Sequence, residues 1–87
     1  MKTSEMFQQE IAKVPIELKL ELDLSFAIAD KIDAKIKEKG MTQKEFAKKM
    51  NKTEAEVSRW LSGTHNFTLK TIAKITNVLG ESIITIP

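Results

Sequence analysis

Two short Thr-x-x-Glu patterns stand eleven residues apart in this chain, at Thr42 and at Thr53, and they leave few alternatives for its fold. In such a pattern the threonine hydroxyl accepts a hydrogen bond from the backbone N–H three residues on, and the glutamate accepts one from the threonine N–H. Each pattern therefore marks the start of a helix. A turn of about three residues around Asn51 separates the two helices, and this arrangement defines a helix-turn-helix over residues 42–63.

The apolar residues of this motif follow helical spacing. They are Phe46, Ala47, Met50, Val57, Trp60 and Leu61. We interpret them as core residues rather than as the lining of a ligand pocket, because apolar residues at this period pack inward. Asn51 tolerates positive φ better than other non-glycine residues and suits the tight turn, and Gly63 ends the second helix.

The N-terminal part predicts two further helices. The spacing of Met6, Phe7, Ile11 and Val14 predicts a short amphipathic helix over residues 4–13, ending before Pro15. Residues 16–28 fit two periods, since apolar and other residues alternate as in a strand, yet Ile16, Leu20, Leu24 and Ile28 among them also recur every fourth position as in a helix. Composition favours the helix, because isoleucine is the only β-branched type and Pro15 suits a first helical position. We predict one helix from Pro15 to Lys39, stopped by Gly40.

The C-terminal part predicts a helix from Thr68 to Gly80 and a short strand from Ser82 to Ile86. The predicted fold class is all-α, with four to five helices and one terminal strand. We divide the chain into an N-terminal extension that includes the start of the long helix (1–22), a helix-turn-helix domain (23–80) and a tail (81–87).

Composition excludes several classes of protein. A chain of 87 residues supports one core, and the absence of cysteine excludes disulfides and thiolate metal sites. We find no signal peptide or membrane span and expect a cytoplasmic protein. Residues 1–40 carry net charge −1 and residues 41–80 carry +4, so the positive charge lies in the second half. His65 is the single histidine, so we expect no catalytic or metal site, no cofactor and no small-molecule substrate.

The stretch from Thr42 to Gly63 resembles the Xre/Cro-type helix-turn-helix family of phage repressors, through Thr-Gln-Lys-Glu-Phe-Ala and Val-Ser-Arg-Trp-Leu-Ser-Gly. Residues 22–80, which include Leu24-Ser25-Phe26-Ala27-Ile28-Ala29-Asp30 and His65-Asn66-Phe67-Thr68-Leu69, resemble the Xre-type antitoxins of bacterial toxin–antitoxin pairs, in particular the HigA type. The resemblance implies a lambda-repressor-like regulator that binds double-stranded DNA at a palindromic operator as a homodimer, associated with the bacterial nucleoid. In antitoxins it also implies a second surface that holds a toxin. The chain departs from the family pattern at Asn51, where glycine is commonest, and at Glu54 and Glu56.

The second helix of the motif carries the candidates for base reading, which are Arg59, Ser58, Ala55 and Glu54. Arg59 is the first choice, because a guanidinium makes a two-pronged contact to guanine O6 and N7; a phosphate contact or an ion pair with Glu56 is the alternative. Ala55 suits a thymine methyl, and Ser58 suits a base or a phosphate. Glu54 suits cytosine N4 or, equally, the positive end of the helix dipole.

Candidates for phosphate contact flank that helix. Gln43 lies at a helix start, where free N–H groups and a side-chain amide bind phosphate oxygens. The loop after the second helix offers further hydroxyl, amide and N–H donors. The full set is Gln43, Thr42, Lys44, Lys52, Ser62, Thr64, His65, Asn66 and Lys70.

A partner surface is predicted on the long helix. Leu18, Leu22 and Phe26 line one side of it, while Ile16, Leu20 and Leu24 line another, so one neighbouring face cannot cover both. We expect the helix that contains Phe7 to cover one side and a second protomer or a toxin to cover the other; the alternative is a fully intramolecular fold. Ile84 of the predicted strand completes the candidate interface. The alternative function is a protein-interaction module whose helix-turn-helix serves as a scaffold.

Overall fold

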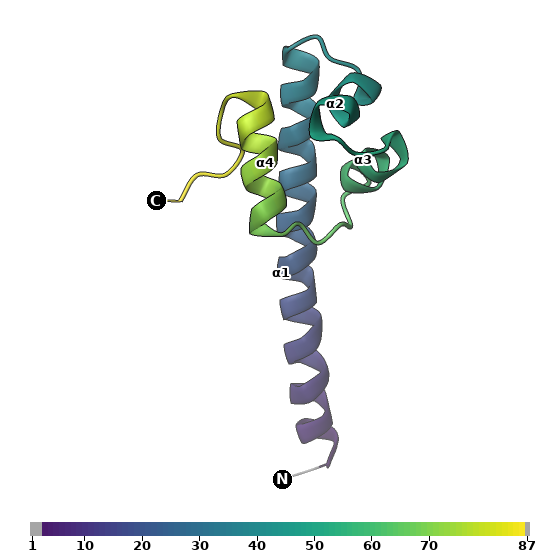
Figure 1. The fold of residues 1–87 in the computed structure, drawn as a ribbon. Helices are drawn as coiled ribbons and strands as arrows, with labels where there is room; N and C mark the ends of the chain where they lie inside the picture. Colours follow the sequence, from purple (N-terminus) through teal and green to yellow (C-terminus); the bar gives the residue numbers. More distant parts are fainter. Residues whose placement is uncertain (1–2, 87) are drawn as a thin grey trace.

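The computed structural model describes the backbone of residues 3–86 and the side chains of residues 15–86. Its helices are α1 (Thr3–Glu38), α2 (Gln43–Met50), α3 (Glu54–Leu61) and α4 (Leu69–Leu79). In Figure 1, α2 and α3 lie on one side of the C-terminal half of α1 and α4 lies on the other side. The predicted all-α class is confirmed.

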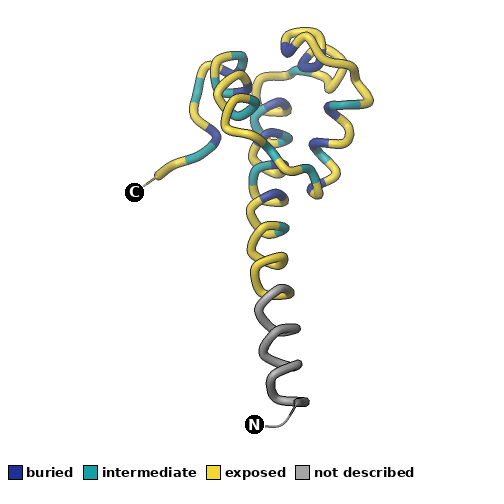
Figure 2. The backbone as a smooth tube through the Cα atoms, turned by 60° about the horizontal axis from the view of Figure 1, so that its bottom comes forward, coloured by how far each residue is buried: buried dark blue, intermediate teal, exposed yellow. Residues whose placement is uncertain are grey.

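The core lies where the three short helices meet the C-terminal half of α1, and Figure 2 shows the buried residues gathered there. Its buried members are Ile32, Ile36, Phe46, Ala47, Met50, Val57, Trp60, Ile75, Leu79 and Ile83. Every apolar residue predicted for the inside of the motif is in this cluster, except Leu61, which packs against it half-buried. The interpretation of these residues as core is confirmed.

The long N-terminal helix differs from the prediction of two helices. α1 runs without interruption from Thr3 to Glu38, and Pro15 lies inside it. A proline within a helix removes one hydrogen bond and crowds the preceding turn, at a cost of about 3 kcal/mol, but it does not forbid helix on both sides. One continuous helix leaves no turn at Pro15 where a separate N-terminal helix could fold back. The predicted end is close to the observed one, and Gly40 has the expected left-handed φ of 69°.

The predicted helix from Thr68 to Gly80 is confirmed. The Thr68 hydroxyl caps α4 by accepting a hydrogen bond from the Thr71 N–H at 3.1 Å, and Gly80 ends it with a φ of 76°.

The predicted strand from Ser82 to Ile86 is wrong, since residues 81–86 form no strand. A strand needs a partner to take up its backbone hydrogen bonds, and none of the described residues offers one. The segment is held by side chains instead. Ile83 is buried in the core, and the Ser82 hydroxyl bonds to the backbone of Ile84.

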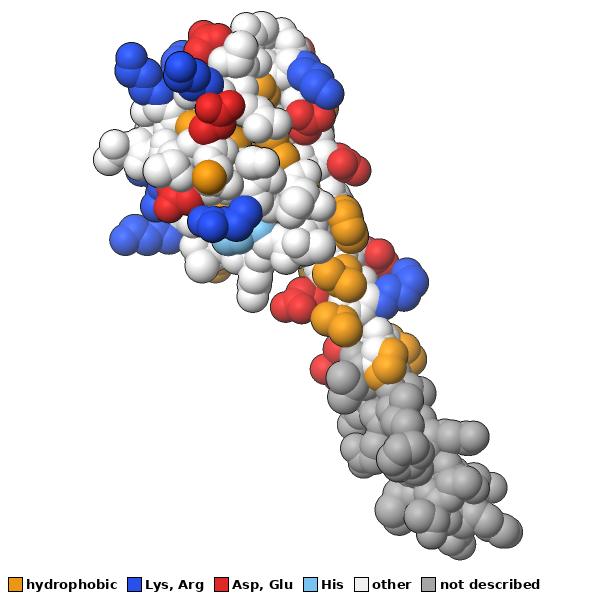
Figure 3. Space-filling view, turned by 90° about the vertical axis from the view of Figure 1, so that its right-hand side faces the viewer, with side chains coloured by type: hydrophobic (Ala, Val, Ile, Leu, Met, Phe, Trp, Pro, Cys, Tyr) orange, Lys and Arg blue, Asp and Glu red, His pale blue; other side chains and the backbone are white. Residues whose placement is uncertain are grey.

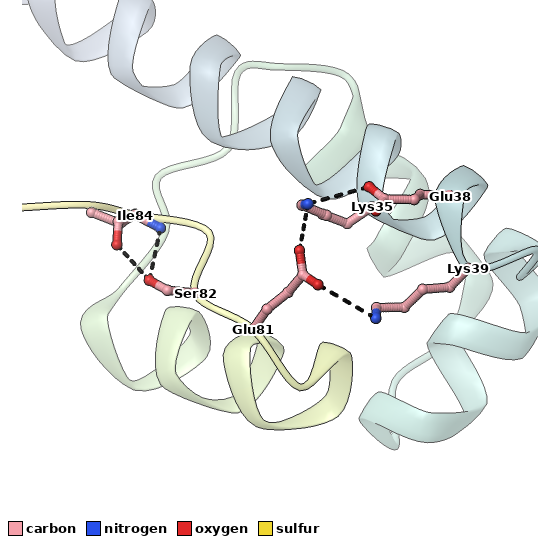
Figure 4. A network of polar contacts seen from close by, with 6 residues as sticks. All are labelled: Lys35, Glu38, Lys39, Glu81, Ser82 and Ile84. Carbon is pink, nitrogen blue, oxygen red and sulfur yellow. Dashed lines mark hydrogen bonds and ion pairs between the residues drawn. The ribbon is translucent and has the colours of Figure 1, made fainter.

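Ion pairs tie the start of this C-terminal segment to α1. The Glu81 carboxylate binds the Lys35 ammonium and lies 3.6 Å from that of Lys39, as Figure 4 shows. The hydrogen bond from Lys35 lowers the pKa of Glu81, desolvation opposes that shift, and the charges of Lys35 and Lys39 lower the pKa further.

Candidate nucleic-acid interface

Both capping boxes predicted from the sequence are present. At the start of α2, the Glu45 N–H donates to the Thr42 hydroxyl at 3.1 Å, and the Thr42 N–H donates to the Glu45 carboxylate at 3.2 Å. At the start of α3, the Glu56 N–H donates to the Thr53 hydroxyl at 3.1 Å and the Thr53 N–H donates to Glu56 at 2.9 Å. These bonds fix where each helix begins.

The turn between the helices is closed by its own backbone. Asn51 has φ 58° and ψ 43°, the left-handed conformation expected for it, and its N–H donates to the Lys48 carbonyl at 3.1 Å. The Lys52 N–H donates to the Ala47 carbonyl at 2.9 Å. Ala47 is buried where α2 packs against α3. The turn therefore holds α3 at a set angle to α2 without a glycine.

α3 presents one polar face to solvent. Val57 and Trp60 are buried beneath it and anchor the helix to the core. The exposed residues are the four base-reading candidates, Glu54, Ala55, Ser58 and Arg59. Because side chains three and four apart share one side of a helix, these four form a continuous surface. An exposed helix face of this kind on a rigid support has the form of an element that enters the major groove of DNA.

Glu56 differs from the exposed residues of α3, because its carboxylate is held by the capping box. The hydrogen bond from the Thr53 backbone N–H lowers the pKa of Glu56, partial desolvation opposes the shift, and the charges of Lys52 and Arg59 lower the pKa further. Arg59 forms no ion pair within the described residues 15–86, so the predicted alternative of a salt bridge to Glu56 is not formed there. Its guanidinium remains available to a ligand.

Two shallow hollows border α3. The first, of about 400 Å³, lies toward α2 and is lined by Lys44, Ala47, Lys48, Asn51, Lys52 and Glu54. The second, of about 280 Å³, lies toward the loop after α3 and is lined by Lys52, Glu56, Arg59, Trp60, His65, Asn66, Thr68 and Thr71. Lys52 borders both hollows. Sequence reasoning left out Lys48, Asn51, Thr68 and Thr71, although Lys48 follows Lys44 by one helical turn and this spacing would have pointed to it.

The remaining phosphate candidates have different surroundings. Gln43 is the exposed first residue of α2, and Lys70 is exposed on α4 but lines neither hollow. The Thr42 hydroxyl already takes part in the capping box. The Ser62 hydroxyl donates to the Arg59 carbonyl at 2.6 Å and lies 3.3 Å from the Thr64 hydroxyl.

His65 belongs to a small aromatic cluster. Its ring stands edge-on to Phe67 with the ring centres 4.8 Å apart, and Trp60 lies 6.0 Å from it. The side chain is half-buried, so packing fixes the ring at the border of the second hollow.

The predicted partner residues differ in how far they are exposed. Leu18 is 50% exposed, and Leu22 and Ile84 are half-buried. Phe26 is 45% exposed, yet its ring lies so close to Gly63 that a Cβ at Gly63 would overlap it. Phe7 lies outside the described side chains. Phe26 therefore also connects α1 to the loop after α3.

Figure 3 views the molecule from the side of α2 and α3. Lysine and arginine side chains are spread over the globular part with acidic ones between them, and hydrophobic side chains line the described part of the helix that projects below. Within the described residues no group of three potential metal-ligating side chains occurs. None of the described helices has the length and apolarity needed to cross a membrane.

Comparison with known protein families matches residues 32–86 to the model described as Helix-turn-helix. No curated protein and no solved structure matches the chain. The matched range covers the C-terminal end of α1 from Ile32 onward, all three short helices and the C-terminal segment. The chain therefore belongs to the helix-turn-helix family of Xre and lambda-repressor type, a family of sequence-specific, double-stranded-DNA-binding regulators.

Proposed function

We propose that this protein is an autorepressing antitoxin that binds a palindromic operator as a dimer. The observation that carries the DNA-binding part is the exposed face of α3, whose four polar or small side chains stand on a helix anchored by Val57 and Trp60. Arg59 reads guanine, Ala55 contacts a thymine methyl, and Ser58 and Glu54 contact neighbouring base edges.

Phosphate contacts flank this helix on both sides in the proposed complex. Lys44 and Lys52 approach the backbone from the first hollow, and His65 and Asn66 approach it from the second. Gln43 adds the free N–H groups at the start of α2. Thr42, Ser62, Thr64 and Lys70 complete the proposed set. Such contacts set the position of the protein, whereas the base edges supply specificity.

The experiment that tests this proposal is a footprint on operators selected from a random library. One recognition helix spans only a few base pairs, so a dimer should protect two inverted half-sites about 34 Å apart. A footprint over a single half-site without repetition would contradict the dimer. Autorepression is tested in bacteria with a reporter fused to the chain's own promoter, whose output should fall when the protein is supplied.

The antitoxin part of the proposal rests on the apolar side chains of α1. Leu18 and Phe26 are exposed, and Leu22 is half-buried beside them. Exposed apolar residues grouped in this way mark an interface. We assign this side of α1 to a toxin encoded by an adjacent gene, with Phe7 and Ile84 as further candidates. The complex would act in the bacterial cytoplasm, at the nucleoid.

Pull-down of the adjacent gene product tests the toxin surface. Changing Leu18 and Leu22 to Ser should abolish capture and toxin neutralisation while circular dichroism shows the helical content unchanged. Capture that is equal to that of the unchanged protein would remove this side of α1 from the toxin interface.

A second candidate function is a protein-interaction module, and the same exposed leucines favour it. The dependence of binding affinity on salt concentration distinguishes the two candidate functions. Binding through a handful of phosphate contacts should weaken roughly tenfold to a thousandfold over a few-fold rise in ionic strength. An apolar protein interface would respond little.

A further inference from the structure

The stretch of α1 over residues 15–24, here called the arm, carries a stripe that the proposed function does not use. Ile16, Leu20 and Leu24 are 59%, 57% and 66% exposed. They recur every fourth residue, so they lie one above another along the helix, about 160° around it from Leu18 on the side assigned to the toxin. Apolar side chains aligned in this way on a soluble protein indicate a contact surface.

The stripe leads into a groove on the globular part. This groove, of about 340 Å³, is lined by Leu24, Ala27, Ile28, Lys31, Ile83, Ile84 and Thr85. Leu24 belongs to both the stripe and the groove, so the two surfaces are continuous. One wall is α1 and the other is formed by Ile83, Ile84 and Thr85 of the C-terminal segment. The surface thus offers an exposed apolar ridge at one end and an apolar recess at the other.

We propose that a second copy of this chain occupies the groove, with the two α1 helices antiparallel and crossing at Leu24. In that register Leu20 of each copy faces Ile28 of the other and enters the groove beside Ile83. The contact is isologous, because each copy supplies one ridge and one recess. The same contact buries both the apolar stripe and the groove.

Charge selects this alignment. The antiparallel register places Glu17 of each copy opposite Lys31 of the other, and two-fold symmetry makes that pair twice. Neither residue is ion-paired within residues 15–86. A parallel alignment would place Glu17 against Glu17 and Lys31 against Lys31, and like charges repel.

The proposed contact leaves the DNA-binding face uncovered. In Figures 1 and 2 the C-terminal segment and the pair α2–α3 lie on different sides of α1. The antiparallel crossing at Leu24 carries the two globular parts toward opposite ends of the helix pair. The proposed function requires two copies on a palindrome, and this contact would hold the two copies together. The biological role of the contact therefore rests on the proposed function.

Sedimentation of the full chain without DNA tests the contact. Leu20→Asp should weaken self-association at least roughly a hundredfold, because each dimer would bury two carboxylates in place of two leucines. The matched control is Leu18→Asp, a change at an exposed leucine of the same arm on the other side, which should alter self-association less than about threefold. Circular dichroism verifies that both variants keep their helical content. An unchanged protein that stays monomeric at high micromolar concentration, or equal losses in both variants, would overturn the inference.

A charge exchange tests the register. Glu17→Lys and Lys31→Glu should each weaken self-association roughly fivefold to tenfold, and the double variant should recover to within about threefold of the unchanged protein. Absence of recovery would overturn the antiparallel alignment. The proposed function fails separately. If the variants change self-association as expected but the dimer does not bind palindromic DNA, the contact stands and the proposed function is wrong. If the protein binds a palindrome as a dimer and Leu20→Asp leaves that dimer intact, the proposed function stands and the contact is wrong.

Discussion

The two halves of α1 have opposite environments although both are rich in apolar residues. In the C-terminal half, Ala29, Ile32 and Ile36 are almost fully buried, at the three-and-four spacing that turns one side of a helix toward a core. In the arm, apolar residues stand at every second position from Ile16 to Leu24, and most of them are exposed. Burial therefore depends on what lies opposite a residue and not on how hydrophobic its segment is.

The largest difference between the halves is expected in stability. Ile32→Ala should lower the free energy of unfolding by about 2–5 kcal/mol, because it leaves a cavity in a close-packed core. Leu18→Ala in the arm should change it by less than about 0.5 kcal/mol. Urea unfolding followed by Trp60 fluorescence measures both. A loss from Leu18→Ala similar to that from Ile32→Ala would mean that the arm is packed in solution.

The junction between the halves is tested at Gly63. Its φ of 91° is strained for any other residue, and a Cβ there would also meet the Phe26 ring. Gly63→Ala should cost about 2–3 kcal/mol of stability. Gly40→Ala is the matched control, since Gly40 has a φ of 69° but open space around its Cα, and it should cost about 1 kcal/mol. Equal costs at the two sites would show that Phe26 does not hold the loop against α1.

The side chains that contact DNA directly should belong to the globular part and not to the arm. Arg59→Ala should weaken specific binding by about 1–3 kcal/mol and relax the preference at one base position. Gln43→Ala should weaken binding to all sequences alike, because phosphate contacts carry no sequence information. Leu18→Ala should leave binding to the operator unchanged. Binding to a set of single-base operator variants measures all three, and an unaltered base preference in Arg59→Ala would make Arg59 a phosphate contact.

The smallest expected effect is on the dependence of stability on pH. The lowered pKa values of Glu56 and Glu81 mean that both carboxylates stabilise the fold above the ordinary value of 4.5, and that this contribution disappears as pH falls through the lowered values. Glu81→Gln should therefore flatten the fall in Tm below about pH 4.5. Lys19→Gln, which removes the Lys19–Asp23 ion pair of the arm, should leave that fall unaltered. If Tm falls with pH in the same way in Glu81→Gln and in the unchanged protein, other groups are responsible for the loss of stability in acid.

Several features of the fold and the candidate site followed from the sequence. The starts of α2 and α3 could be placed because the Thr42 and Thr53 boxes satisfy their hydrogen bonds within four residues, and such local bonds need no knowledge of the rest of the chain. The exposed face of α3 followed from the same boundaries, since the period of a helix sets which side chains share a side. The left-handed turn at Asn51 is likewise a property of that residue type.

Features that depend on distant parts of the chain required the tertiary structure. Pro15 has the same local signature inside a helix as at its start, and Ser82–Ile86 has the composition of a strand without another strand to pair with. The contact of Phe26 with Gly63 and the ion pair of Lys35 with Glu81 join residues far apart in sequence. Local patterns define which hydrogen bonds and faces a segment offers, whereas the partners of those faces are decided only when the segments pack together.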